Sequence, residues 1–194
     1  RDIGTRKWFG VCRDCYETRT IRSPDAPSIR PRVYCIDANP NAHNRTKFCA
    51  NKLQKDDTLA QGWELFLLGM SNRTGIMSYE ICGNKEDCGM CRVGEERRSQ
   101  KCFDINVTSY DKFAQDHGIG FADLVKLDTE GEEPMIIQGM HNALASKNVG
   151  FLAFEVHGSG KGWYGKFDMS RIVDLMSAYG YVCYMDAGPD ARLQ

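Results

Sequence analysis

Short apolar segments rich in β-forming residues alternate with helix-like segments along most of this chain of 194 residues. This alternation is typical of folds in which parallel strands are joined by crossover helices. The length is sufficient for one substantial hydrophobic core but hardly for two. We therefore expect residues 1–194 to form a single α/β domain with a doubly wound, mostly parallel sheet.

The expected strands end at turn residues, and the expected helices have recognisable starts and stops. Ser109 is a favourable N-cap for one helix and Gly118 is its expected stop, because glycine readily adopts the conformation that follows a helix. Pro134 is tolerated in the first turn of another helix. The strands are expected at residues 33–37, 63–69, 75–81, 103–107, 123–128, 150–156 and 181–185, and the helices at about 42–59, 109–117, 132–144 and 168–180.

A long segment without hydrophobic periodicity interrupts this pattern at residues 82–102. It is crowded with glycine, cysteine and charge, so it cannot order itself by burying apolar surface. We expect an insertion or long loop that is held by disulfides among Cys82, Cys88, Cys91 and Cys102.

The cysteine content and the glycosylation sequons indicate in which cellular compartment the protein is located. Nine cysteines are many for a reduced cytosolic protein of this size. Three Asn-x-Ser/Thr sequons, at Asn44, Asn72 and Asn106, point the same way. We expect a secretory, lumenal or extracellular location, with a cytoplasmic one left open. Because the chain begins with Arg1 instead of Met, we also expect a processed or partial chain in which a targeting segment would not be visible.

Charge and hydropathy limit the partners. Basic and acidic residues nearly cancel, which leaves a formal net charge of -1, so no global field attracts nucleic acid or an anionic membrane. No apolar run approaches the roughly 18 residues that a membrane-spanning helix needs. We expect a soluble protein whose partner is a small molecule or another protein.

The most informative segment runs from Leu124 to Glu133. Asp128 closes an apolar strand, so its carboxylate is expected at the carboxyl edge of the sheet, where open α/β folds bind ligands. Glu130 and Gly131 form the turn into the next helix, and glycine permits a close backbone approach there. A purely structural alternative stays open, in which Asp128 and Glu130 only cap that helix.

This segment resembles the strand, acidic turn and helix of FkbM-type S-adenosylmethionine-dependent methyltransferases, where an apolar pair is followed by Lys-Ile-Asp, any residue and Glu-Gly. The similarity extends upstream through residues 108–113 and downstream through residues 154–157, in the correct order. It implies a Rossmann-like, class I methyltransferase fold with S-adenosylmethionine as the cofactor. On that basis Asp128 and Glu130 would line the donor or acceptor pocket.

The resemblance also assigns cofactor contacts to two earlier segments. In Rossmann-type methyltransferases an acidic residue at the end of the second strand binds the ribose hydroxyls, and Asp37 resembles that residue. Ser71 and Asn72 resemble loop residues that lie beside the adenine. The alternatives are that Asp37 is a simple turn residue and that residues 69–75 form a plain hairpin turn.

The chain departs from the family in its first motif, which reads Asp-x-Gly-Ala-Asn-x-Gly after the first strand. The candidate here is the segment 2–8, in which Asp2 and Gly4 match the motif and would contact the cofactor. Arg6 replaces the Asn and Trp8 the last Gly, so bulky side chains stand where the ligand should lie. Either the loop is rearranged or cofactor binding has been lost.

Two Cys-x-x-Cys pairs raise the question of a metal. Cys12 with Cys15, and Cys88 with Cys91, could supply the four thiolates of a zinc site. The separation between the pairs is far larger than in compact zinc modules. We therefore expect disulfides, with free thiols as the alternative, and no bound metal.

His157 follows the strand expected at residues 150–156 and precedes a glycine-rich segment. A histidine in this position is a candidate general base for an acceptor hydroxyl, with Asp128 and Glu130 as further catalytic candidates. An ordinary solvent-facing histidine is an equally good interpretation.

The resemblance favours methyl transfer from S-adenosylmethionine to an oxygen of a small molecule or glycan. The alternative is a catalytically inactive methyltransferase-like domain that serves as a structural or interaction subunit of a larger assembly, which Arg6, Trp8 and the insertion favour. A third hypothesis is a secreted domain that binds sugars through Trp163 and Tyr164.

Overall fold

A five-stranded parallel sheet forms the centre of the molecule. The computed structural model describes residues 7–10, 32–56, 62–80, 102–129, 131–156 and 168–185. Within them the strand order of the main sheet is β3-β2-β1-β7-β8, and every pairing is parallel. These strands are β1 (Lys7–Gly10), β2 (Arg32–Asp37), β3 (Trp63–Leu67), β7 (Ala122–Leu127) and β8 (Val149–Phe154).

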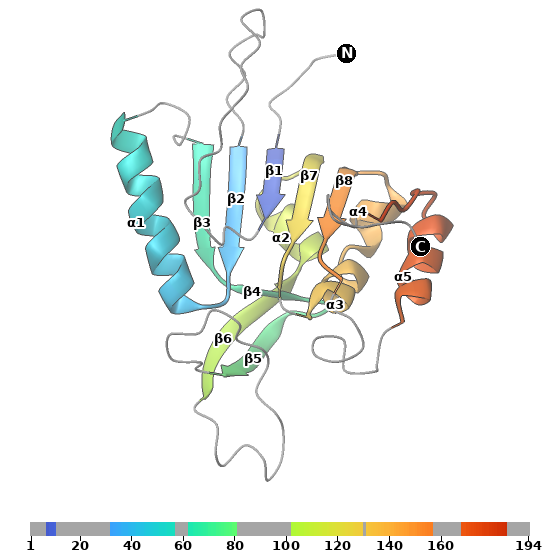
Figure 1. Cartoon of the computed structure of the whole chain (residues 1–194), viewed down its shortest axis with the longest axis horizontal. Coiled ribbons are helices and arrows are strands. Elements are labelled where there is room, and N and C mark those ends of the chain that lie inside the picture. The colour runs from blue at the N-terminus through green and yellow to red at the C-terminus, as the bar shows by residue number, and fades with distance from the viewer. Residues whose placement is uncertain are drawn as a thin grey trace, which may run out of the picture.

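The strand order reverses direction at β1, which pairs with β2 on one side and with β7 on the other. Counted by its own strands, the sheet has the order 3-2-1-4-5, the first five positions of the Rossmann order. Figure 1 shows all five arrows pointing the same way. The expected α/β fold with a parallel sheet is confirmed, and its doubly wound layering stays a prediction.

A second, smaller sheet begins where β3 ends. It contains β4 (Gly69–Ser71), β6 (Cys102–Ser109) and β5 (Gly75–Glu80), in the order β4-β6-β5. Strand β4 is parallel to β6, and β5 is antiparallel to it. In Figure 1 this sheet lies beyond the arrow tips of the main sheet, at its carboxyl edge.

Three expectations for this region are wrong. The strand expected at 63–69 divides at Leu68, whose N–H donates to the carbonyl oxygen of Asp37 at 3.1 Å. Residues 69–75 do not form a plain hairpin turn, because β6 lies between β4 and β5. Cys102, which was expected in the insertion, is the first residue of β6; the remainder of the insertion lies outside the described residues.

The helices begin and end largely where the sequence predicts. Ser109 caps α2, since its Oγ accepts a hydrogen bond from the backbone N–H of Lys112 at 3.2 Å, and Gly118 follows with φ 60°. Asp168 caps α5 in the same way through Ser170. The bounds are α1 (Pro40–Asp56), α2 (Tyr110–Asp116), α3 (Glu133–Gln138), α4 (His141–Ala145) and α5 (Met169–Ala178). None of these described helices is long and apolar enough to cross a membrane.

The helix expected at 132–144 is broken into α3 and α4 at Gly139 and Met140. A Cβ atom on Gly139 would lie 2.3 Å from the carbonyl oxygen of Ser71, which is too close for any side chain. The backbone of β4 therefore passes directly against this turn. The break follows from a tertiary contact, which the helical periodicity of the segment does not reveal.

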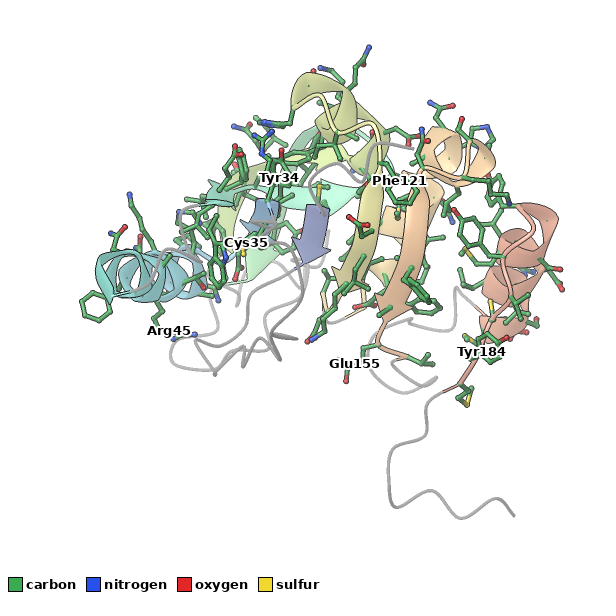
Figure 2. The ribbon with its side chains drawn as sticks, turned by 90° about the horizontal axis from the view of Figure 1, so that it is seen from above. Tyr34, Cys35, Arg45, Phe121, Glu155 and Tyr184 are labelled. Atoms are coloured by element: carbon green, nitrogen blue, oxygen red, sulfur yellow. The ribbon has the colours of Figure 1, made fainter. Side chains whose placement is uncertain are left out.

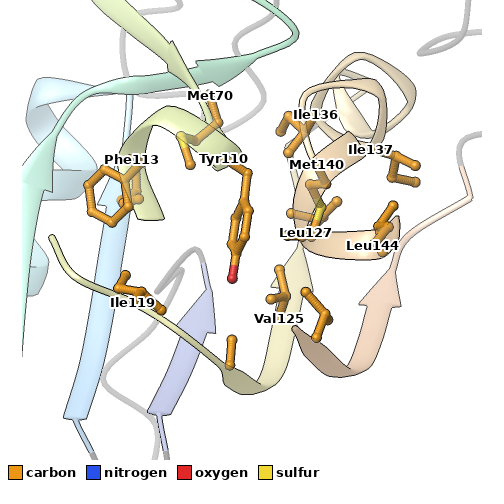
Figure 3. Packing of buried hydrophobic residues seen from close by; sticks show 14 of the residues in the cluster. Met70, Tyr110, Phe113, Ile119, Val125, Leu127, Ile136, Ile137, Met140 and Leu144 are labelled. Atoms are coloured by element: carbon orange, nitrogen blue, oxygen red, sulfur yellow. The ribbon is translucent and has the colours of Figure 1, made fainter. Parts of the chain in front are cut away.

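The main core packs against one face of the main sheet and is built with residues of α2, α3, α4 and α5. Adjacent residues of a strand point to opposite faces, and Figure 2 shows this for Tyr34 and Cys35. Tyr34 faces α2, with its ring centroid 6.1 Å from that of Phe113. Figure 3 shows Tyr110 at the centre of the cluster. The other large buried members include Met70, Phe113, Val125, Leu127, Ile136, Ile137, Met140 and Leu144.

Residues 181–185 were expected to form the last strand, and this is wrong. Their side chains alternate as in a strand, since Tyr181 and Cys183 pack against the core while Val182 is 75% and Tyr184 91% exposed. No described strand pairs with them. The segment is instead held by its side chains, as the Tyr181 hydroxyl donates to the carbonyl oxygen of Val149 at 2.8 Å. Tyr184 lies out on the surface in Figure 2.

Candidate functional site

Asp37 and Asp128 lie at the carboxyl edge of the main sheet, on the two sides of β1. Gly10, the last residue of β1, is level with Cys35 in β2 and with Lys126 in β7. Each aspartate therefore follows two residues beyond the level of Gly10. Since neighbouring strands are about 4.8 Å apart, the two backbones are separated by roughly 10 Å. This is the position at which open α/β sheets bind ligands, because the strand order reverses there.

The two oxygens of the Asp37 carboxylate have different surroundings. Its Oδ1 accepts a hydrogen bond from the backbone N–H of Asn39 at 2.7 Å. No hydrogen bond from the described residues reaches Oδ2. Burial raises the pKa of Asp37, against the opposing effects of the Asn39 hydrogen bond and of His43 and Arg45. The turn interpretation of Asp37 is therefore correct, and it leaves one carboxylate oxygen available for a ligand.

Asp128 follows β7 directly and is largely enclosed. Its side chain is 10% exposed, and Oδ2 lies 3.1 Å from Nζ of Lys126. The two residues are two positions apart, so they emerge on the same face of the sheet. Lys126 is itself 54% exposed, so solvent screens this ion pair and it adds little stability. Its effect is to set a positive charge beside the carboxylate at the carboxyl edge.

Glu133 holds the turn that carries Asp128, a role that sequence reasoning missed. This side chain is fully buried, at 0% exposure. Its Oε1 accepts from the backbone N–H of Thr129 at 2.7 Å and from the Thr129 hydroxyl at 2.9 Å. Its Oε2 accepts from the N–H of Gly131 at 3.0 Å. In the sequence, Glu133 looks like an acidic residue in the first turn of a helix, and such residues are usually exposed. The signals of a tight turn at this place are Gly131, two residues earlier, and Pro134, which follows directly.

The backbone of this turn explains why a glycine is needed. Gly131 has φ 112°, a conformation that residues with a side chain rarely adopt. The expected close turn at Gly131 is therefore present. Glu130, between Thr129 and Gly131, lies outside the described residues, so its role in the pocket stays a prediction.

Ser71 and Asn72 lie beside α3 and the turn that follows it. Ser71 is 1% exposed, within β4. Asn72 is exposed, and its Nδ2 donates to Oε1 of Gln138 in α3 at 3.1 Å. The structure thus brings Asp37 and Asp128 to the same edge but sets Asn72 against α3. Contact of Ser71 or Asn72 with an adenine stays a prediction.

The first strand begins inside the segment that was matched to the family's first motif. Lys7 and Trp8 were placed in a loop after the first strand, but they belong to β1, where Trp8 is in register with Val33 and Leu124. The interpretation that Trp8 occupies the cofactor loop is therefore wrong. Asp2 and Gly4 lie outside the part of the chain that the structure describes, as does His157, and their roles stay predictions.

Cysteine chemistry is described for three residues. Cys35 and Cys102 are each disulfide-bonded, and Cys183 is a free thiol. The two Cys-x-x-Cys pairs lie outside the described ranges. Among the residues that are described, no group of three or more histidine, cysteine or acidic side chains is placed to hold a metal ion.

Comparison with known proteins identifies the family of this chain. A sequence model described as the Methyltransferase FkbM domain matches residues 27–183. No curated protein matches the chain. The crystal structure of methyltransferase FkbM from Methylobacillus flagellatus KT is similar at 14% identity, with a TM-score of 0.47, over 74% of this chain and 30% of that protein. Because the family match spans most of the sequence, the chain belongs to the FkbM methyltransferase-domain family.

Proposed function

We propose that this protein transfers a methyl group from S-adenosylmethionine to an oxygen atom of a small molecule or glycan. Membership of the FkbM family supports methyl transfer in general. The observation that carries the finer proposal is the pair of aspartates that flank β1 at the carboxyl edge, at the reversal of strand order. When bound, the cofactor would supply an electrophilic methyl group to the acceptor oxygen.

The donor set at this edge fits a nucleoside with free ribose hydroxyls. Asp37 presents a half-buried carboxylate oxygen that no described residue engages. A carboxylate accepts hydrogen bonds only, so it suits a pair of hydroxyl donors. The cost of keeping that carboxylate charged in a half-buried position, shown by its raised pKa, is offset when such donors arrive.

Asp128 would complete the pocket from the other side of β1. Its carboxylate is nearly buried and is oriented by Lys126, while Glu133 fixes the following turn. A group held in this way needs no rearrangement when a ligand binds, which lowers the cost of alignment. Glu130 and His157 are the proposed neighbours of the acceptor, with His157 as the base that takes the hydroxyl proton.

The inactive-domain alternative loses part of its support. It relied in part on Trp8 standing in the cofactor loop, whereas Trp8 is a residue of strand β1. Arg6 and residues 82–101 of the insertion, which also favour it, lie outside the described residues. The same strand order that defines the fold places β1 between the two aspartates. We therefore favour an active enzyme.

Calorimetric titration of the full chain with S-adenosylmethionine tests the proposal. We expect saturable binding of one cofactor per chain, and weaker binding of adenosine, which lacks the charged methionine part. S-adenosylhomocysteine should compete for the same site. An absence of heat with S-adenosylmethionine and S-adenosylhomocysteine, in a preparation shown to be folded by circular dichroism, would contradict the proposal.

A further inference from the structure

A groove separate from the carboxyl-edge aspartates runs along α2, between that helix and the α3–α4 turn. Its volume is about 570 Å³, within the roughly 300–1,000 Å³ of small-molecule sites. We call it the amide groove, because five of its fourteen lining residues carry a carboxamide side chain. Its lining residues include Asn72, Gln115, Gln138, Asn142 and Asn148.

The walls of the amide groove are polar and the floor is apolar. Gln115, Asn142 and Asn148 are exposed, and none of their side-chain amides makes a hydrogen bond within the described part of the chain. Ile119 and Ala143, which also line the groove, are buried. Each carboxamide offers both donors and an acceptor, so the walls can bond groups that both donate and accept.

Hydrogen bonds between the two sides of the groove fix its shape. The carboxylate of Asp111 in α2 accepts from the backbone N–H groups of Asn142 at 2.7 Å and of Ala143 at 3.0 Å. The N–H of Asp111 donates in turn to the carbonyl oxygen of Gly139 at 3.0 Å. These bonds fix α2 against α4, so a ligand would meet a preformed surface.

The amide groove offers no net charge to a ligand. Asp111 is engaged by backbone donors, and Lys112 pairs with Asp116 on its own helix. An anionic ligand would therefore find no unpaired cation among the lining residues. A purely apolar ligand would strip water from the carboxamides without replacing their hydrogen bonds.

We propose that the amide groove binds a neutral saccharide. Sugar hydroxyls both donate and accept hydrogen bonds, as the carboxamide walls require, and the C–H faces of a sugar ring would lie on Ile119 and Ala143. This inference does not rest on the proposed methyl transfer, because the groove shares neither Asp37 nor Asp128. Of the residues expected to contact the cofactor it shares Asn72, which the test below does not use.

The test uses the full ¹⁵N-labelled chain and follows side-chain carboxamide resonances by NMR during titration. The probes are N-acetylglucosamine, galactose and maltose as neutral saccharides, with glucuronate and adenosine monophosphate as anionic comparisons. We expect at least one neutral saccharide to shift the resonances of Gln115 and Asn142, with weaker effects from the anions. Silence of these resonances with all three neutral saccharides, or a preference for the anions, would overturn the proposal.

Two substitutions of similar size remove the amides and leave the helices intact. Gln115→Met combined with Asn142→Leu should weaken saccharide binding by roughly tenfold or more, because each lost hydrogen bond is uncompensated. Asn41→Leu, an exposed carboxamide at the start of α1, is the matched control and should leave binding unchanged. If the double variant does not fold, Gln115→Met alone serves, since Gln115 is exposed on α2.

Equal saccharide affinity of the variant and the wild type would contradict the assignment of the groove. Calorimetry with S-adenosylmethionine distinguishes this outcome from failure of the proposed methyltransferase activity.

Discussion

Asp37 and Asp128 stand at the same level of the main sheet, each two residues beyond a neighbour of Gly10 in the strand between them. The two carboxylates belong to segments 91 positions apart in the sequence. The parallel strands bring them to one edge of the sheet, and the reversal of strand order places them on the two sides of β1. The candidate site is thus a product of topology.

Asp37→Asn should weaken the binding of S-adenosylmethionine. Asparagine keeps an oxygen for the Asn39 N–H, so the turn survives, while the charged acceptor is lost. A hydrogen bond to a charged group contributes about 1.5–3 kcal/mol, so affinity should fall by roughly 10-fold to 150-fold. Calorimetric titration measures this. Asp174→Asn, at an exposed position of α5, is the control; an equal loss in both variants would contradict a specific role for Asp37.

The same substitution should stabilise the unliganded protein at neutral pH. Burial raises the pKa of Asp37, so between the ordinary and the raised value the folded state binds more protons than the unfolded state. The contribution of Asp37 to the free energy of unfolding therefore decreases as pH rises through that window, and above it the charged group is a net cost. Urea unfolding should show Asp37→Asn to be more stable than the wild type at neutral pH, and the difference should vanish at pH values below the ordinary pKa of aspartate. Lower stability of the variant at neutral pH would show that the turn depends on the charge.

Much of the fold could be predicted because its signals are local. Ser109 caps α2 and Gly118 ends it as the sequence indicates, and the apolar runs that end at Asp37 and Asp128 are strands. The family resemblance also assigned both aspartates to the ends of strands, Asp37 as a ribose ligand and Asp128 in the donor or acceptor pocket. Each of these features depends on a few consecutive residues or on a known topology.

The features that could not be predicted depend on contacts between distant segments. The helix breaks at Gly139 because the carbonyl oxygen of Ser71 in β4 lies directly against it. Glu133 is buried because the turn at residues 129–131 folds back over its side chain. The alternation at residues 181–185 predicts a strand, but a strand also needs a hydrogen-bonded neighbour, which the described chain does not supply. The position of β1 was predicted wrongly, because residues 2–8 match the first motif of the family only in part.

Glu133 should be far more sensitive than an exposed carboxylate. Glu133→Gln keeps one acceptor oxygen but sets an NH₂ group against a backbone N–H of the turn, which leaves a buried donor without a partner. The free energy of unfolding should fall by about 1–3 kcal/mol, and by more in Glu133→Ala. Glu64→Gln, which breaks an exposed ion pair with Arg32, should cost about 0–1 kcal/mol. Urea denaturation compares them; similar costs for Glu133→Gln and Glu64→Gln would refute the anchoring role.

Gly139→Ala should destabilise the protein for purely steric reasons. The backbone at Gly139 has φ -75°, which alanine adopts easily, so the cost comes from the Cβ atom against Ser71. Separating α3 from β4 to make room should cost about 1–3 kcal/mol. Gly120→Ala is the matched control, because nothing lies within 4 Å of its added Cβ atom. It should be neutral or stabilising by up to about 1 kcal/mol. Thermal unfolding of the two variants settles the comparison, and equal melting temperatures would show that β4 yields without strain.

A crystal structure of the full chain with S-adenosylhomocysteine tests the proposed cofactor site most directly. We expect electron density for the nucleoside between the carboxyl ends of β2 and β7, with the ribose hydroxyls within hydrogen-bonding distance of the Asp37 carboxylate. Asp128 should lie on the opposite side of the ligand, with its turn still bound to Glu133. Density at another place, or an edge between Asp37 and Asp128 that stays empty at saturating ligand, would contradict the proposed site.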